Sequence, residues 1–269
     1  MPSKNRDPIG AVVIGDLHCG GTTALWPPDG KLTSGNSVGI GRNACQRWLW
    51  KVWTETKRTA IDHFGSDPWV LILNGDLIDG AHHHNKEMCA VIEADHMEAA
   101  IQCVEPLVKK AQQTFVIRGT ECHTRDFEKV IADRLKAHYC GDKALLKIHG
   151  TTIDVAHHMP TTGRAYLEAS ALSILIGNAR LNYSRVGQKL PKVFLRAHRH
   201  VGGFYSDGSA AIVATGAYQL LTRWATKVVG ESICRPAFAI LDWRGSPKNS
   251  LPAIKLPTYD PAKPKVTVC

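Results

Sequence analysis

Five short segments of the chain carry histidine and carboxylate side chains directly after an apolar run. They are Asp16 with His18, Asp76, Glu121 with His123, His157 with His158, and His198 with His200. Imidazole and carboxylate groups are common ligands of divalent transition metals. A single pair of this kind is more often a surface or core feature, but five such segments in one chain of 269 residues predict a metal centre.

These residue types favour a centre with two metal ions. Two divalent cations about 3.5 to 4 Å apart need a shared carboxylate, flanking histidine and carboxylate ligands, and a bridging hydroxide as nucleophile. A ligand set rich in imidazole suits Mn, Fe, Zn, Co or Ni better than Mg or Ca. We therefore expect two divalent transition-metal ions as cofactors, with Mn as the first choice and Fe, Zn, Co or Ni as alternatives.

Apolar runs and helical periodicity place the segments at the ends of buried strands. In the first half of the chain, β-branched runs alternate with stretches of helical spacing. The expected strands cover 9–14, 69–73 and 114–117, and the expected helices cover 43–64, 89–112 and 126–138. Parallel strands joined by helical crossovers gather reactive groups at their carboxyl ends. The first three segments should therefore meet at one edge of a sheet.

The second half of the chain indicates a more antiparallel sheet. It contains a predicted hairpin over 145–155, a helix over 164–183, and strands at 192–196, 203–205, 210–213 and 237–241. From Pro247 onward, five prolines and four lysines occur with one acidic residue, which is typical of a surface tail. We therefore expect a single catalytic domain over 1–246 and a Pro/Lys-rich C-terminal tail over 247–269.

The order of the segments resembles that of calcineurin-like metallophosphoesterases, whose signatures are DxH, GD, GNH(D/E), H and GHxH. The matching residues are Asp16-Leu17-His18, Gly75-Asp76, Gly119 before a His-containing turn, His157, and Ala197-His198-Arg199-His200. The resemblance covers residues 9 to about 200, and the closing strands fit to about 243. It implies an α/β fold, a four-layer αββα sandwich of two mixed β-sheets flanked by helices, with the dinuclear metal site at the sheet edge.

The resemblance also implies roles for the matching residues. Asp16, His18 and His200 would hold the first metal, and Asp76 would bridge the two metals. The second metal would be held by His157 and His198.

One turn departs from the family pattern. The family has an Asn ligand followed directly by a catalytic His, whereas this turn contains Thr120, Glu121 and, two residues later, His123. In an extended turn Glu121 and His123 would point the same way. We therefore expect Glu121 to be the metal ligand and His123 the catalytic acid. The alternative is that Thr120 or water takes the ligand position while Glu121 orients His123.

The charge of the chain bears on its substrate. A formal net charge of +9 favours a polyanionic partner. We expect a metal-dependent phosphoesterase, with a phosphodiesterase or nuclease acting on nucleic acid or nucleotides as the favoured form. The alternatives are a phosphomonoesterase acting on proteins or small phosphates, and a non-catalytic metal-binding scaffold. Arg125 and Arg199 are candidates for binding the substrate phosphate, although solvated surface arginines are an equal interpretation.

Composition excludes several other classes of protein. No apolar run approaches the roughly 18 residues of a spanning helix, so no membrane partner is expected. The N-terminal stretch lacks the apolar core of a secretory signal, which predicts a cytoplasmic protein. Eight cysteines without a CxxC pair argue against a zinc ribbon or a redox motif and predict reduced thiols.

Overall fold

The strands form two mixed sheets in the computed structural model, which describes residues 6–29, 43–81, 87–124, 126–159, 168–222 and 234–261. The strands of the first sheet are β1 (Gly10–Ile14), β2 (Trp69–Asn74), β3 (Gln113–Ile117), β4 (His138–Tyr139), β10 (Ala239–Asp242) and β11 (Ala253–Lys255). Those of the second are β5 (Lys143–Ile148), β6 (Thr151–Ala156), β7 (Val193–Arg196), β8 (Gly203–Ser206) and β9 (Ala211–Ala214). The strand orders are β11-β10-β1-β2-β3-β4 and β5-β6-β7-β9-β8.

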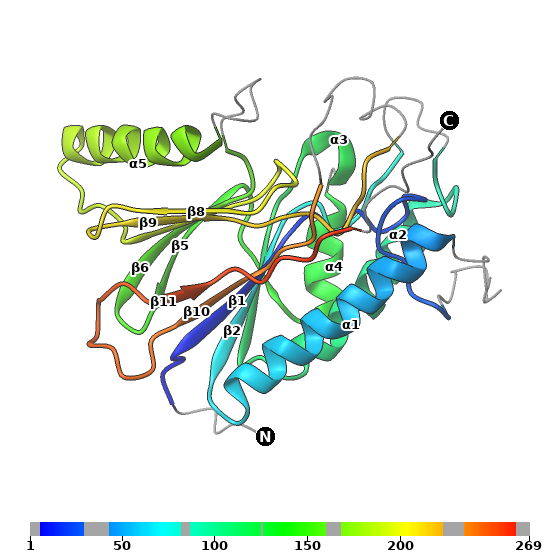
Figure 1. Ribbon diagram of the computed structural model, residues 1–269, viewed down its shortest axis with the longest axis horizontal. Helices are drawn as coiled ribbons and strands as arrows, with labels where there is room; N and C mark the ends of the chain where they lie inside the picture. The colour runs from blue at the N-terminus through cyan, green and yellow to red at the C-terminus, as the bar shows by residue number, and fades with distance from the viewer. Residues whose placement is uncertain are drawn as a thin grey trace, which may run out of the picture.

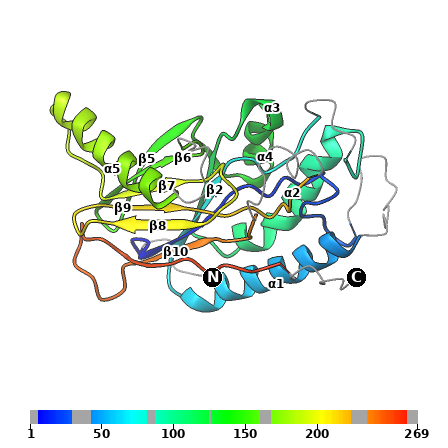
Figure 2. The ribbon, with the colours of Figure 1, turned by 45° about the horizontal axis from the view of Figure 1, so that its top comes forward.

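Helices cover the outer faces of both sheets. They are α1 (Ala44–Phe64), α2 (Glu93–Val108), the short α3 (Glu121–Thr124), α4 (Phe127–Leu135) and α5 (Glu168–Arg185). Figure 1 shows α1, α2 and α4 on the side of the first sheet and α5 over β8 and β9 of the second, and Figure 2 shows the same arrangement from a tilted direction.

Three hydrophobic clusters confirm a four-layer sandwich. Alternate residues of β1 face opposite sides of the sheet, as a strand requires. Val12 and Ile14 pack with α1, α2 and α4, whereas Ala11 and Val13 pack against residues of β6, β7 and β9 in the other sheet. The third cluster joins Phe194 of β7 and two residues of β9 to α5. The layers are therefore helices, first sheet, second sheet and helix, as the resemblance implied.

The strand directions bring the chemistry-bearing segments to one edge. In the first sheet β1, β2 and β3 are parallel neighbours, so their carboxyl ends lie together. In the second sheet β7 runs parallel to both β6 and β9. The predicted hairpin is confirmed as the antiparallel pair β5 and β6. All five segments therefore follow strands that end at the same edge of the two sheets.

Two expectations from the sequence are corrected by the structure. The helix expected from residue 89 begins at Glu93, because Cys89 instead donates its backbone N–H to the carbonyl of Gly20 and so ties residues 87–89 to the loop after β1. The tail expected from 247 contributes β11, which pairs with β10, and Leu251 and Ile254 pack against the core between the sheets. Its described part, to residue 261, is an edge of the first sheet.

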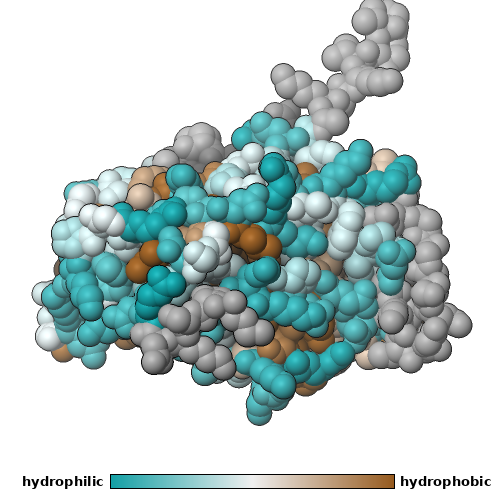
Figure 3. Space-filling view, turned by 90° about the horizontal axis from the view of Figure 1, so that it is seen from below, coloured by the Kyte–Doolittle hydropathy of each residue, from teal (hydrophilic) through white to brown (hydrophobic). Residues whose placement is uncertain are grey.

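The surface agrees with a chain of average composition. Figure 3 shows a face dominated by hydrophilic residues, on which hydrophobic residues appear only in small groups. Among the residues that the structure describes, no helix has the length and apolar character needed to cross a membrane. The described cysteines are all free thiols, in agreement with the absence of a CxxC motif.

Candidate metal centre

The loops after β1 and β2 continue side by side beyond the sheet. The backbone N–H of Asp16 donates to the carbonyl of Gly75 at 3.0 Å, and that of His18 donates to the carbonyl of Asp76 at 3.0 Å. The second sheet is tied to the same place, because the N–H of His198 donates to Oδ2 of Asp16 at 2.9 Å. Hydrogen bonds from backbone amides therefore hold the three loops together at this edge.

Five of the candidate ligands have a left-handed backbone. Their φ angles lie between +46° and +74° and belong to Asp16, His18, Asp76, His198 and His200. Each residue other than glycine in this conformation costs about 1–2 kcal/mol. Such strain is found mostly where the surrounding structure imposes it for a function. Its concentration on predicted ligands supports a functional site here.

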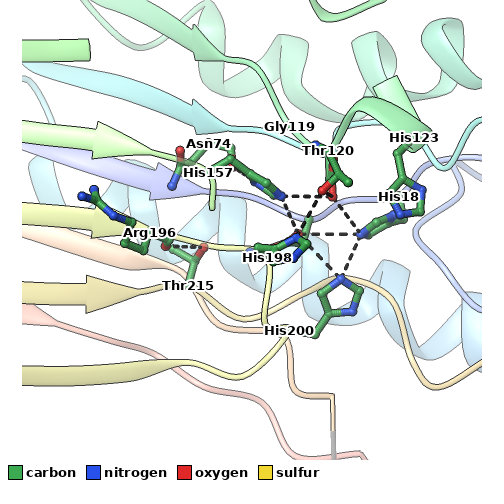
Figure 4. Close-up of polar contacts among 12 residues, drawn as sticks. His18, Asn74, Gly119, Thr120, His123, His157, Arg196, His198, His200 and Thr215 are labelled. Carbon is green, nitrogen blue, oxygen red and sulfur yellow. Dashed lines mark hydrogen bonds and ion pairs between the residues drawn. The ribbon is translucent and has the colours of Figure 1, made fainter. Parts of the chain in front are cut away.

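Seven side chains converge into three overlapping groups of potential ligands, drawn in Figure 4. The groups are Asp16 with His18 and His200; His18 with Asp76 and His123; and Asp76 with His157 and His198. Within each group the ligand atoms lie within 4.8 Å of one another. His18 and Asp76 each belong to two groups, and Asp76 is the carboxylate of the two, the type of ligand that two metals can share.

Three of the histidines present the same nitrogen to the centre. Nε2 of His18 lies 3.0 Å from Nε2 of His200, and Nε2 of His157 lies 3.0 Å from Oδ2 of Asp76. Their Nδ1 atoms face outward. Nδ1 of His18 lies 3.3 Å from Oδ1 of Asp79, and Nδ1 of His157 lies 2.7 Å from the carbonyl oxygen of Asn74. Nδ1 of His200 lies 3.9 Å from Sγ of Cys234. Outer partners of this kind orient the ring of a ligating histidine.

The buried carboxylates set the charge of the site. Burial alone would lower the pKa of His18, but hydrogen bonding to Asp16 and Asp79 outweighs it and raises that pKa to about 10. Burial also opposes protonation of His157, yet the charges of Asp76 and Asp16 raise its pKa to about 9. The centre therefore stabilises positive charge strongly.

His200 differs from the other two histidines. Burial, opposed by the charge of Asp16 and assisted by that of His18, lowers the pKa of His200 to about 4. Its imidazole is therefore neutral at pH 7, the form in which histidine binds a metal.

The residues fit a divalent metal pair. Asp16, Asp76, Asp79 and Glu128 are all nine-tenths or more buried in one region. Oδ1 of Asp16 is buried without a hydrogen-bond partner among the described residues, although it lies 3.7 Å from Nε2 of both His18 and His200. A buried carboxylate without compensation is costly, and coordination of a cation would compensate it. Burial opposes ionisation of Asp76 and Asp16, but the neighbouring histidines together, His157 foremost, outweigh it and lower the pKa of both carboxyls. Both are therefore ionised, as ligands must be.

Glu121 is not where the sequence analysis placed it. Its side chain is 87% exposed, and its carboxylate lies 3.9 Å from the guanidinium of Arg118, outside the centre. The extended turn assumed for residues 121 and 123 is instead the first turn of α3, in which His123 donates its N–H to the carbonyl of Thr120. Successive helical residues point about 100° apart, so Glu121 and His123 diverge. The prediction of Glu121 as a metal ligand is therefore wrong.

Thr120 occupies the position that the family pattern gives to Asn. Its Oγ1 lies 3.0 Å from Oδ2 of Asp76 and 3.1 Å from Nδ1 of His198, and its backbone N–H donates to Oδ1 of Asp76 at 2.6 Å. This position agrees with the part of the alternative that concerns Thr120, whereas the exposed Glu121 does not orient His123. The hydroxyl is an oxygen atom that faces two of the candidate ligands.

His123 lies beside the centre with a ring nitrogen held from outside. Its Nδ1 donates to the carbonyl of Asp79 at 2.8 Å and lies 3.6 Å from Oδ1 of the same residue. The ring meets that of His18 edge-on, with 4.7 Å between centroids. Arg199 lies on the loop between two ligands and is partly exposed, whereas Arg125 lies outside the described residues.

Sequence reasoning did not assign roles to Asp79 and Glu128. Both are fully buried, and their partners are ligand rings or backbone amides of other loops. Asp79 follows Asp76 by three residues in the sequence, but the residues around it do not indicate that its side chain faces His18. Glu128 falls in the first turn of a helix, where an acidic residue is ordinary.

No protein-family model and no curated protein matches the chain. Among solved structures, an archaeal phosphodiesterase has 12% identity and a TM-score of 0.47, covering 93% of this chain and 99% of that one. Vacuolar protein sorting 29 from Cryptosporidium parvum has 12% identity and a TM-score of 0.46, covering 98% of this chain and 97% of that one. Vps29 from Entamoeba histolytica in complex with zinc has 12% identity and a TM-score of 0.43, covering 93% and 98%. Similarities at this level are too weak to support a function.

Proposed function

We propose that the protein is a metal-dependent phosphoesterase that cleaves phosphodiesters of nucleic acid or nucleotides. The observation that carries this proposal is the convergence of seven ligand-type side chains from five strand ends, with Asp76 shared between two of the ligand groups. These residues resemble, in order, the signatures of calcineurin-like metallophosphoesterases, except in the turn that carries His123.

The residues divide between two metal positions. Asp16, His18 and His200 would hold one cation, Asp76 would be shared, and His157 and His198 would hold the other with Thr120 beside them. Divalent cations bound there, with Mn as the first candidate, would activate water and neutralise the charge of the phosphoryl oxygens. The neutral His200 and the ionised carboxylates suit this role. The raised pKa values of His18 and His157 mean that both rings would have to release a proton to bind a metal.

His123 is the candidate general acid. Its Nδ1–H is held by the Asp79 carbonyl, so Nε2 is the nitrogen that would give a proton to the leaving oxygen. The carboxylate of Asp79, 3.6 Å from Nδ1, stabilises the positive charge that the ring carries before transfer. A proton donor matters most for an alkoxide leaving group, which diesters and monoesters of alcohols both release.

The net charge of +9 supports a polyanionic substrate over a neutral one. Arg199 lies between two ligands in sequence and is the described arginine best placed along the chain to reach a phosphate. A phosphomonoesterase and a non-catalytic scaffold are the competing functions.

The test is a panel of substrates offered to the Mn-loaded protein. The panel contains bis-nitrophenyl phosphate, nitrophenyl phosphate, single- and double-stranded DNA, RNA, cyclic nucleotides and a phosphopeptide. We expect hydrolysis of the diesters, and loss of that hydrolysis in Asp76→Ala. Asp242→Asn, at the far end of β10, is the matched control and should keep full turnover.

Three results would contradict the proposal. Preference for the phosphopeptide would favour a monoesterase. Metal binding without hydrolysis of any substrate would favour a scaffold. Undiminished hydrolysis in Asp76→Ala would remove the shared-carboxylate site altogether.

A further inference from the structure

We infer that Glu128 is a positioning residue that holds the two loops of the metal centre in register, an inference that rests on the metal site of the proposed function. Glu128 lies in the first turn of α4 and is fully buried. Neither the family signatures nor the sequence analysis assigns it a role.

The carboxylate of Glu128 binds both loops at once. Its Oε2 accepts the backbone N–H of Gly119 at 2.5 Å, and its Oε1 accepts that of Leu77 at 3.2 Å. Leu77 directly follows Asp76 after β2, and Gly119 directly precedes Thr120 after β3. One side chain from a helix therefore joins the two strand ends that supply the shared carboxylate and the threonine hydroxyl.

Asp76 completes the arrangement from the opposite side. It accepts the N–H of Thr120 at 2.6 Å, so two successive amides of this loop are held by two different carboxylates. The loop has no room to adjust, because a Cβ on Gly119 would lie 2.2 Å from both the backbone nitrogen and Oδ1 of Asp76. Releasing the Gly119 amide would therefore displace Asp76 itself.

Glutamine cannot replace Glu128 in this role. Both oxygens of Glu128 accept an amide hydrogen bond, whereas glutamine offers one acceptor and turns an NH2 donor toward the other amide. One buried backbone N–H would then lose its partner, which is costly. Burial and the charge of Asp76 raise the pKa of Glu128 to about 8, and the two backbone hydrogen bonds oppose that shift.

The experiment compares Mn²⁺ affinity, by calorimetric titration, with thermal stability for Glu128→Gln and a matched control. The control is Asp154→Asn, which removes an equally buried carboxylate bound to Arg196 and Lys143 in the second sheet. We expect Glu128→Gln to bind Mn²⁺ about 10- to 100-fold more weakly, the usual effect of losing an outer partner of a metal ligand. Asp154→Asn should keep wild-type affinity even if its melting temperature falls.

Glu128→Asp gives a second reading if the Gln variant does not fold. It retains two acceptor oxygens but is one methylene shorter, so it should also weaken Mn²⁺ binding. The inference would be overturned if a variant of Glu128 that folds bound Mn²⁺ with wild-type affinity. An equal loss of affinity in Asp154→Asn would also overturn it, as would the absence of Mn²⁺ binding by the wild-type protein. Wild-type metal binding without hydrolysis would defeat the proposed activity and leave the role of Glu128 intact.

Discussion

Two loops of the centre approach each other closely at Gly119, and adding a methyl group there should disable the site. The Cβ of Gly119→Ala would lie 2.2 Å from the backbone nitrogen and Oδ1 of Asp76. Real Cβ contacts essentially never fall below 3.0 Å, so Asp76 or the loop must move by about 0.8 Å. A misplacement near 1 Å costs roughly 10²-fold in turnover. Gly119 lacks a positive φ, so the effect is one of space and not of backbone strain.

The assay is turnover of bis-nitrophenyl phosphate together with Mn²⁺ affinity. Gly177→Ala is the matched control, because a Cβ there meets nothing within 4 Å. Gly177 lies within α5, so this control should raise stability by roughly 0.5–1 kcal/mol and leave turnover unchanged. If Gly119→Ala keeps turnover and Mn²⁺ affinity within twofold of wild type, the two loops are not coupled as described.

Three further predictions concern single side chains. Thr120→Val keeps the shape of the residue but removes its hydroxyl, so elemental analysis should find weaker retention of one metal. Glu121→Ala should leave the metal content unchanged. The opposite pattern would restore Glu121 as the ligand. His123→Ala should retain both metals but lose roughly 10²-fold in steady-state turnover of a diester with an alkoxide leaving group. The loss should be much smaller for a diester whose leaving group is nitrophenolate. An equal loss for both substrates would exclude a proton-donor role. Burial opposes ionisation of Asp242, but hydrogen bonds from Arg244 outweigh it and lower the pKa of Asp242 to about 2. A carboxyl group with a lowered pKa stabilises the fold above pH 4, and this stabilisation is lost as pH falls from about 4 to 2. Asp242→Asn should therefore reduce the pH dependence of the melting temperature over that range. An unchanged slope of melting temperature against pH would contradict the assignment.

The sequence was sufficient to locate the strand ends and most of the side chains that converge beside them. Asp16, Asp76 and His198 each follow a buried run closely, so the local pattern fixes both the strand and the place where it ends. The parallel order of β1, β2 and β3 then brings those ends together without further information. The layer order followed from the family resemblance, which supplied the pairing of the two sheets.

The remaining features depend on contacts between distant segments. Whether Thr120 or Glu121 faces the centre depends on the turn being helical, which a four-residue sequence does not determine. Glu128 was not recognised because its partners are backbone amides, which look the same at every position of a sequence. Strand β11 was expected to be part of a tail because it is a short edge strand in proline- and lysine-rich surroundings and pairs only with β10.

Metal content per chain, measured by elemental analysis after loading with Mn²⁺ and dialysis, tests the central claim most directly. The two-metal site predicts about two ions per chain in the wild-type protein and a clear loss of bound metal in Asp76→Ala, accompanied by loss of diester hydrolysis. Fewer than one ion per chain in the wild type, or undiminished hydrolysis in Asp76→Ala, would contradict a dinuclear phosphoesterase centre at this sheet edge.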